Sequence, residues 1–411
     1  MSSQRTPPIA IDNAREILLD SIIPIEEVEV ISLDQAYGRI ASETLFSKID
    51  LPSTQNAAVD GYAVHSDSLL KAPDQTFKIV GIARAGHPFN GVIGKDEAIE
   101  IYTGGVMPKG PDCVAMHEDC SRDGNKILVS ATLSKGSNMR PPGENLAKGE
   151  TLISKGQMIT AALIGQLAAS GTARLPVSRR IRVAILSTGD EVVAAGSSAT
   201  SGQIFDANRP MLKAMLQHNH IDLIDCGIVP DNKDALADAY EQALQGADVV
   251  ISSGGASDGI EDHTQNAMLQ IGAECVFWRL AMKPGRPMAV GRRGKELIFC
   301  LPGNPVAAFV CTRLLILPLL GRASGGAWQP ALKIGVPAGF THRKKPGRAE
   351  FLRVVLENNG GKQQLVLHGR KGAGVISSLT GADGLVEIPL DNAGVELGTV
   401  LNFLPFHERG L

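Results

Sequence analysis

Four short apolar runs in the middle of the chain each end in a loop whose residues could bind phosphate or metal. The runs span residues 181–186, 221–229, 248–251 and 296–301, and the loops that follow them span 187–191, 230–232, 252–257 and 302–305. Three of the loops lead into a helical pattern. Such strand–loop–helix repetition predicts βαβ units in a parallel sheet, where ligands bind beyond the carboxyl ends of the strands. We therefore expect all four loops to lie on one edge of one sheet.

The loop at 252–257 is the first candidate for phosphate contact. Its adjacent glycines, Gly254 and Gly255, let the backbone come close to a ligand, and Ser252 and Ser257 add hydroxyl donors. The loop is not a Walker loop, because no Gly-Lys-Ser/Thr follows it. An ordinary turn has a similar composition, but the expected place at the sheet edge favours ligand contact.

The loop at 302–305 precedes a long apolar helical pattern. Asn304 suits the N-cap and Pro305 the first helical position, and the free N–H groups of such a helix start form an anion site. Capping alone would explain both residues equally well. On the first loop, Thr188 and Gly189 stand at the same expected edge.

Carboxylates gather at this edge. They are Asp190, Glu191, Asp231, Asp258, Glu261 and Asp262. Carboxylates beside a phosphate usually need a hard cation between them, so we expect Mg²⁺, with Asp190, Glu191 and Asp262 as ligands. Helix capping would also explain Asp231, and a solvated surface would also explain Glu261.

Basic side chains occur in one further loop. Lys283 and Arg286 stand in Lys-Pro-Gly-Arg after an apolar run, where they could neutralise a phosphate or an oxyanion. A surface loop would look the same. In the first half of the chain, Asp60 and Thr103 stand in polar, glycine-rich segments that the residues alone predict to be turns.

The bulk composition limits the classes of function. The chain has 411 residues, 44% of them hydrophobic, and a net charge of -3. This length predicts two to four domains, and no basic excess or charge run predicts nucleic acid or a membrane surface as a partner. The longest apolar stretch, 306–320, is interrupted by Arg313 and Pro318 and is too short to span a bilayer. Six cysteines without a Cys-x-x-Cys pair, and an amino terminus unlike a secretory signal, predict free thiols in a cytoplasmic protein.

The surrounding patterns predict the elements that position these loops. A helical stretch and a Val/Ile-rich segment lie within 9–50, and short β-like runs rich in Gly and Pro fill 51–140. A helix over 160–170 precedes the α/β pattern, which begins at 180. The last segment, 331–411, alternates in short strands and predicts a small all-β barrel.

Taken jointly, these motifs resemble the molybdopterin molybdenumtransferases, the family that includes the E domain of gephyrin. The resembling segments, in family order over nearly the whole chain, are VDGYAV (59–64), TGGVMPKGPDCV (103–114), STGDE (187–191), SSGGASDG (252–259) with Asp262, MKPGRP (282–287) and LPGNP (301–305). Each motif is modest by itself, whereas the set in this order is specific.

The resemblance implies a multidomain α/β plus β fold and an elongated homodimer. Its domains are a discontinuous linker domain, an inserted β-rich domain, a doubly wound parallel-sheet domain that binds the pterin, and a C-terminal small β-barrel, over residues 1–50 with 141–178, 51–140, 179–328 and 329–411. The implied reaction inserts molybdate into adenylylated molybdopterin with Mg²⁺ and releases AMP. Molybdopterin adenylyltransferase and apo-molybdoenzymes are the implied partners.

The resemblance also implies roles for residues. Glu191, Asp231 and Asp262 resemble the acidic site residues and Lys283 the basic one, while Asp60 and Thr103 resemble residues that reach the cleft from the partner subunit's inserted domain. The expected substrate-binding residues are Thr188, Gly189, Ser252, Gly254, Gly255, Ser257, Arg286, Pro302, Gly303, Asn304, Arg353 and Ser377.

Four positions depart from the family pattern. Asn145 stands where an aspartate is usual, Arg279 where a lysine is common, Ala373 where a serine is common, and Asp258 where the residue is usually uncharged. These departures leave a second hypothesis open, a scaffold paralogue that binds molybdopterin without turnover. A nucleotide pyrophosphatase on a similar α/β domain is the third.

Overall fold

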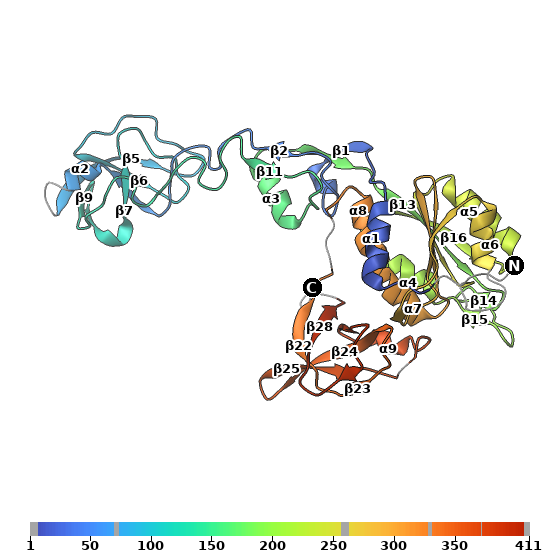
Figure 1. The fold of residues 1–411 in the computed structure, drawn as a ribbon. Helices are drawn as coiled ribbons and strands as arrows, with labels where there is room; N and C mark the ends of the chain where they lie inside the picture. Colours follow the sequence, from blue (N-terminus) through green and yellow to red (C-terminus); the bar gives the residue numbers. More distant parts are fainter. Residues whose placement is uncertain (1–6, 70–73, 256–262, 328–330, 371, 407–411) are drawn as a thin grey trace.

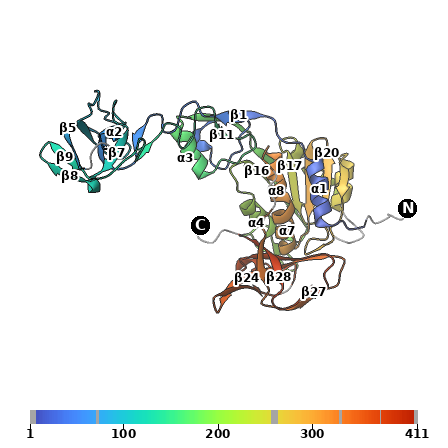
Figure 2. The ribbon, with the colours of Figure 1, turned by 60° about the vertical axis from the view of Figure 1, so that its left-hand side comes forward.

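The computed structural model describes residues 7–69, 74–255, 263–327, 331–370 and 372–406. Figure 1 shows an elongated molecule, in which a narrow linker joins a β-rich lobe at one end to an α/β domain at the other. A small β domain packs beside the α/β domain. Figure 2 shows the same separation of the β-rich lobe from the α/β domain in a second view.

The β-rich lobe is one six-stranded sheet with a short helix, α2 (Ser66–Leu69). Its strands are β4 (Gly61–Val64), β5 (Gln75–Ala83), β6 (Glu97–Ile101), β7 (Cys113–Met116), β8 (Cys120–Asp123) and β9 (Lys126–Val129), in the order β7-β4-β6-β5-β9-β8. A Cβ on Gly61 would lie 1.9 Å from the carbonyl oxygen of Ala115 on β7. The close approach of these strands therefore requires the glycine that follows Asp60.

The linker consists of paired segments from both sides of the insertion. The pairs are β1 (Val28–Ser32) with β12 (Arg174–Ser178), β2 (Leu45–Phe46) with β11 (Thr151–Ile153), and β3 (Asn56–Ala57) with β10 (Met139–Arg140). Helix α3 (Ala161–Ala169) covers them, and Thr160 caps it by accepting a hydrogen bond from the Leu163 N–H. Short 3₁₀ turns occur at η1 (Leu33–Gln35) and, in the lobe, at η2 (His117–Asp119).

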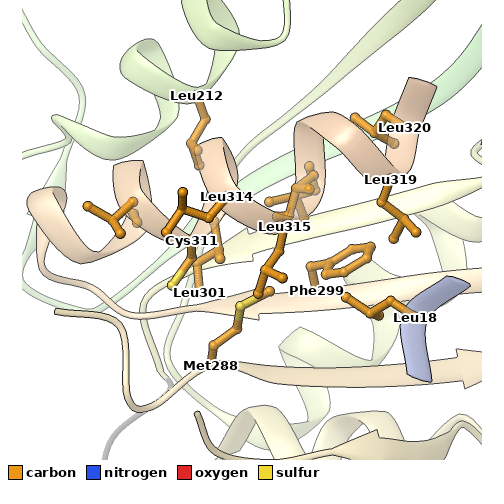
Figure 3. Close-up of a cluster of buried hydrophobic side chains, with 14 of the residues drawn as sticks. Leu18, Leu212, Met288, Phe299, Leu301, Cys311, Leu314, Leu315, Leu319 and Leu320 are labelled. Carbon is orange, nitrogen blue, oxygen red and sulfur yellow. The ribbon is translucent and has the colours of Figure 1, made fainter. Parts of the chain in front are cut away.

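Helix α1 (Ile11–Ser21) differs from the expectation for its segment. It belongs to the 1–50 segment expected in the linker, yet it packs on the α/β domain. The reason is its apolar face, because Ile11, Ala14 and Leu18 are buried in the same cluster as Phe299 of the sheet. Figure 3 shows Leu18 and Phe299 side by side.

The α/β domain is built on a six-stranded sheet of order β16-β13-β17-β21-β20-β18. The strands are β13 (Ile181–Thr188), β16 (Ile221–Val229), β17 (Val249–Ser253), β18 (Glu274–Phe277), β20 (Ala289–Arg293) and β21 (Glu296–Leu301). The first four in spatial order are parallel, as expected, but β20 runs antiparallel to both of its neighbours, β21 and β18. The sheet is therefore mixed, because two residues between β20 and β21 are too few for a parallel crossover.

Helices cover both faces of this sheet. One face carries α5 (Lys233–Leu244) and α6 (His263–Gln270), and the other carries α1, α4 (Asn208–Met215), α7 (Pro305–Cys311) and α8 (Leu317–Ala323). A π-helical turn, η3 (Thr312–Ile316), joins α7 to α8. The whole 19-residue run is long and apolar enough to cross a membrane, but most of it is buried in this domain. Leu314, Leu315 and Leu319 lie near Phe299 in Figure 3, which is the packing of a core helix.

The C-terminal domain is a small β domain. Its strands are β22 (Ile334–Pro337), β23 (His342–Arg343), β24 (Ala349–Asn359), β25 (Lys362–Leu367), β26 (Gly384–Ile388), β27 (Gly394–Val395) and β28 (Val400–Pro405), with one helix, α9 (Ser377–Thr380). β25 pairs with β24, and the sheet continues through β26 and β28 to β22. A bridge from Ala338 to Leu365 brings the chain after β22 back to β25. These contacts close the strands into a small barrel around Val354 and Val386.

One further strand joins the two C-terminal domains. Strand β19 (Met282–Lys283) leaves the α/β domain and pairs in parallel with β24 of the β domain. A second two-stranded pair, β14 (Val192–Val193) with β15 (Ile204–Phe205), projects from the α/β domain beside the end of β13.

Candidate functional site

All four predicted loops meet at the carboxyl edge of the sheet: three pack directly against one another, and the loop after β16 joins them through Asp231. The N–H of Gly254 donates to the carbonyl of Leu301 at 3.2 Å, which joins the loop after β17 to the loop after β21. A Cβ on Gly254 would lie 2.0 Å from the carbonyl oxygen of Thr188, and a Cβ on Gly303 would lie 3.7 Å from Gly254. Gly254 also has a φ of +108°, so both the backbone and the close packing require glycine there.

Asn208, at the start of α4, ties these loops together. Its Nδ2 donates to the Ser253 hydroxyl and to the Gly303 carbonyl, each at 2.7 Å. Behind it, the Ser187 hydroxyl donates to Asp206 at 3.0 Å. These residues line a small pocket of about 90 Å³. Sequence reasoning missed Asn208 and Asp206, although an aspartate two residues before a helical pattern that begins Asn-Arg-Pro is a cue for a helix start.

The acidic residues of the edge lie close enough together for their negative charges to repel one another. The Asp231 N–H donates to Asp190 Oδ1 at 3.1 Å. Asp231 Oδ1 and Thr188 Oγ1 are buried and have no hydrogen-bond partner among the described residues. Burial raises the pKa of Asp231 and the charges of Asp190 and Glu191 raise it further, against the opposing effects of nearby His263 and of the Thr188 hydroxyl. A buried carboxylate oxygen that faces other carboxylates is suited to a cation.

The structure also decides between two explanations for Asp231. The cap of α5 is Asn232, whose Oδ1 accepts a hydrogen bond from the Ala235 N–H at 2.9 Å. Asp231 is thus not needed as the cap. Gly255 lies beside Asp231, since a Cβ on Gly255 would be 3.3 Å from Asp231 Oδ1 and 2.5 Å from Thr264 Oγ1. The Thr264 hydroxyl is likewise buried without a partner in the described part of the chain.

Two predicted serines lie elsewhere than expected. Ser252 is fully buried, with its hydroxyl 2.9 Å from the Tyr240 hydroxyl beneath α5, so it does not face the edge. Side chains alternate along a strand, which turns Ser253 and not Ser252 toward Asn208. In the β domain, Ser377 is exposed, and the buried Ser378 is the serine that contacts Arg353.

The helix start at Asn304 is shared with the β domain. Pro305 is the first residue of α7, as predicted, but the Asn304 side chain makes no capping hydrogen bond within the described residues. The N–H of Val306 donates to the Ala373 carbonyl at 3.0 Å. One of the helix-start N–H groups is therefore already satisfied by the barrel loop. Pro302 contributes its carbonyl, which accepts a hydrogen bond from the Ser253 hydroxyl at 3.4 Å.

The basic residues meet at the boundary between the α/β and β domains. Lys283 Nζ lies 3.2 Å from Glu350 Oε1, and both residues line a cavity of about 140 Å³ with Arg353 and Arg370. Burial lowers the pKa of Arg353, whose Nε donates to Ser378 at 3.0 Å. The other loop cation, Arg286, is half-buried. This cavity borders the start of α7 through Ala373.

Asp60 and Thr103 form a pair of their own. Asp60 Oδ1 accepts hydrogen bonds from the Thr103 N–H at 2.7 Å and from its hydroxyl at 2.8 Å, and these bonds lower the pKa of Asp60. The neighbouring Gly104 lines a groove of about 500 Å³ with Arg140 and Asn145. The lobe that carries this pair lies at the far end of the molecule from the α/β domain (Figures 1 and 2). One chain does not bring the pair to the sheet edge.

Several predicted residues are not among those that the structure describes. Ser257, Asp258, Glu261 and Asp262 lie outside the described residues. Within the described part of the chain, no three His, Cys, Asp or Glu side chains are placed to hold a metal ion by themselves. Mg²⁺ usually binds through one or two carboxylates together with waters and substrate phosphates. One or two carboxylates from Asp190, Glu191 and Asp231, completed by waters and substrate phosphates, fit that mode of binding.

Cavity size alone does not mark this site. A larger groove of about 490 Å³ lies at the opposite edge of the sheet, beside Ile181, Val249 and Leu297 at the strand starts. Arg179 crosses it to Asp248 at 2.8 Å. None of the predicted site residues lines that groove, so the chemistry of the carboxyl edge, not its volume, identifies the candidate site.

Comparison with known proteins gives matches along the chain in order. Residues 9–171 match the model of the MoeA N-terminal region (domain I and II), residues 184–322 a probable molybdopterin binding domain, and residues 336–406 the MoeA C-terminal region (domain IV). A molybdopterin molybdenumtransferase from Haemophilus influenzae is 32% identical over 97% of this chain and 99% of its own length. A molybdopterin molybdenumtransferase 2 from Mycobacterium tuberculosis is 30% identical over 90% of this chain and 93% of its own.

Solved structures agree. The crystal structure of a molybdopterin biosynthesis MoeA protein from Pyrococcus horikoshii has a TM-score of 0.84 and 27% identity, covering 97% of this chain and all of that one. A second structure from the same organism has a TM-score of 0.80 at 30% identity. The similarity therefore extends over all the domains described above.

Proposed function

Because the chain belongs to the molybdopterin molybdenumtransferase family, we propose that it inserts molybdate into adenylylated molybdopterin, in a Mg²⁺-dependent reaction that releases AMP. It is a transferase of molybdenum cofactor biosynthesis. The observation that carries the finer proposal is the carboxyl edge, where Gly254 lets the loops after β13 and β17 pack closely and the buried oxygens of Asp231 and Thr188 make no well-formed hydrogen bond within the described residues.

The diphosphate of the substrate is expected at the loops after β13, β17 and β21. Gly254 and Gly303 bring backbone close together there without side chains in the way, and Asn208 fixes the distance between the two loops. Backbone N–H groups and hydroxyls in such a concave loop bind phosphate oxygens well. Thr188 supplies a further hydroxyl at the same place.

The carboxylates of the edge are the proposed ligands of the metal. Asp190, Glu191 and Asp231 would hold Mg²⁺ together with the phosphates, and the ion would neutralise charge on the phosphoanhydride as AMP leaves. In the free protein the same carboxylates repel one another, which contributes to the raised pKa of Asp231. This unrelieved charge supports a cation as part of the working site.

The oxyanion is expected at the domain boundary. Lys283 and Arg353 present two cations to the 140 Å³ cavity, and burial of Arg353 strengthens its interaction with an anion. Molybdate is here a substrate, so the cavity has to release it toward the edge rather than retain it. Proximity of the Ala373 loop to α7 places the cavity beside that edge.

We further propose a homodimer whose partner subunit completes the site. Asp60 and Thr103 form a ready pair of polar groups, but their lobe lies far from the edge of the same chain. The linker also exposes apolar side chains that a second copy would cover: Ile23, Val28, Val30, Phe46 and Met158. A second subunit would therefore bury this surface and supply the missing residues together.

We also propose a cytoplasmic location, supported by six free cysteines. The substrate is an adenylylated pterin and the product a loaded cofactor. We therefore propose two partners. One is an adenylyltransferase that supplies the substrate, and the other is an apo-molybdoenzyme that receives the product.

The test is AMP release from adenylylated molybdopterin with and without molybdate and Mg²⁺, for the wild type and Glu191→Ala. Release that requires molybdate and is lost in the variant supports the transferase. Tight binding of the pterin without release would instead support the scaffold hypothesis, which the exposed Asn145 in the Gly104 groove favours. Cleavage of free dinucleotides without pterin would support the pyrophosphatase.

A further inference from the structure

The loop that carries Lys283 is built into the sheet of the β domain. Met282 pairs with Ala349 and Lys283 with Glu350 in parallel register, and the Ala349 N–H donates to the Ala281 carbonyl at 2.9 Å. The backbone position of Lys283 is therefore fixed by β24, although the loop leaves the α/β domain. We therefore expect the side chain that contacts Lys283 to lie on β24 as well.

Glu350 is the group on β24 that meets this lysine. Its side chain is 10% exposed, with Oε1 at 3.2 Å from Lys283 Nζ and Oε2 at 2.8 Å from His342 Nε2. Burial opposes ionisation of Glu350, but hydrogen bonds from His342 and Lys283 outweigh it and lower its pKa. The carboxylate is thus charged at neutral pH and is held on one side by a buried imidazole.

The lysine itself has little else to restrain it. The Lys283 side chain is 60% exposed, and a lysine carries four rotatable bonds. His342 is only 7% exposed, so it fixes Glu350, and Glu350 in turn fixes Lys283. His342, Glu350 and Lys283 all line the cavity that Arg353 lines, so these contacts act at the cavity itself.

We propose that Glu350 is a positioning residue for molybdate insertion, which holds the Lys283 ammonium at the mouth of the cavity opposite Arg353. The inference rests on the proposed function, in which Lys283 binds an oxyanion. A carboxylate beside an anion cavity weakens anion binding by its charge, so the proposed role of Glu350 is to set the geometry of Lys283 and not to raise the affinity for the anion. The position of a charged group relative to the reacting atoms has a large effect on the reaction rate, even where binding is unchanged.

The matched variants are Glu350→Gln and Glu387→Gln. Glu387 lies in the neighbouring strand β26, its side chain is 11% exposed, and it pairs with Lys333 Nζ at 2.8 Å. It does not line the 140 Å³ cavity. Both variants remove one buried charge from a Glu–Lys pair of the same domain, so a loss of folding alone affects them alike.

The expected result is a split between turnover and binding. Glu350→Gln lowers kcat of molybdate-dependent AMP release by about tenfold to a hundredfold. The half-saturating molybdate concentration stays level or falls, because a negative charge has been removed. Glu387→Gln keeps the wild-type kcat. Unchanged kcat in Glu350→Gln, or an equal loss in both variants, would overturn the proposal.

A second measurement does not depend on activity. The rate of lysine acylation is followed by mass spectrometry in the full chain, and Glu350→Gln is expected to raise it several-fold at Lys283, with Lys333 unaffected. Glu387→Gln is expected to do the reverse. An unchanged rate at Lys283 would refute the positioning role even if the wild type releases no AMP, in which case the proposed function fails separately.

Discussion

Asp231 Oδ1 and Thr188 Oγ1 are both buried at the sheet edge and make no well-formed hydrogen bond within the described part of the chain, although the Thr188 hydroxyl lies close enough to Asp231 to lower its pKa. Such groups cost stability, because desolvation is not offset by a hydrogen bond. Proteins tend to keep that cost where a ligand removes it. The repulsion between Asp231, Asp190 and Glu191 adds to it, and the raised pKa of Asp231 is its signature.

Asp231→Asn is therefore expected to separate function from stability. Molybdate-dependent AMP release should fall by about a hundredfold or more, because a group that holds the metal is lost. Thermal unfolding should stay level or rise, because an unpaired buried charge has been removed. A raised pKa means that the wild type loses stability as pH rises through it, and the variant should lack that loss. Parallel loss of both activity and stability would contradict this account.

Asp225 illustrates the opposite case at the same scale. Burial alone would raise its pKa, but hydrogen bonds from Lys213 and Arg209 lower it to about 2. A depressed pKa gives stability that is present above the unfolded value of 3.8 and is lost as pH falls toward 2. The partial exposure of Asp225 weakens the effect.

Asp225→Asn should accordingly destabilise the α/β domain by about 1 kcal/mol at pH 7. The difference from the wild type should shrink as pH falls below 4 and vanish near 2. Denaturant unfolding at a series of pH values measures this. A difference independent of pH would show that the charge of Asp225 does not contribute.

At the scale of elements, helix α4 connects two loops at the sheet edge. Its first residue, Asn208, connects the loop after β17 with the loop after β21, which no local pattern joins. The strand β19 does the same between domains by adding Lys283 to the β24 sheet. Both elements act through contacts at a distance in sequence.

Asn208→Ala should loosen the two phosphate loops. Loss of two buried hydrogen bonds is expected to cost about 2 kcal/mol of stability and to weaken substrate binding about tenfold or more. Thr160→Ala is the matched control, because it removes the cap of α3 in the linker and costs about 1 kcal/mol. Titration of adenylylated molybdopterin reads binding, and equal binding by both variants would remove Asn208 from the site.

At the scale of the whole molecule, the elongated shape separates two halves of the proposed site. The Asp60–Thr103 pair stands on the β-rich lobe, and the acids stand on the α/β domain at the other end (Figure 1). Joining them within one chain would require the linker to fold back, whereas a two-fold dimer joins them without such a change.

Coexpression of Asp60→Ala with Glu191→Ala tests this arrangement. Each variant by itself should be inactive, and mixed dimers should recover up to about a quarter of wild-type activity, because half the dimers are mixed and each has one intact site. Size-exclusion chromatography checks that both variants dimerise. Absence of recovery in confirmed mixed dimers would place the whole site within one subunit.

Much of the site was predictable because it depends on local order. The loops after β13, β17 and β21, and Pro305 at a helix start, follow from short-range periodicity and turn chemistry. The chain pattern also predicted the parallel core of the sheet, where a strand, a loop and a helix repeat. The antiparallel strand β20 escaped it, since a short apolar run does not reveal its direction.

The sequence by itself determined which loops carry phosphate and metal chemistry. The glycine, hydroxyl and carboxylate residues that suit those ligands stand within a few positions of one another in each loop. The tertiary structure alone decided that Asn208 binds two distant loops, that Ser253 and not Ser252 faces the pocket, and that Glu350 meets Lys283 from 67 residues away. Those contacts depend on strand register and domain packing, which bring together residues that no periodicity relates.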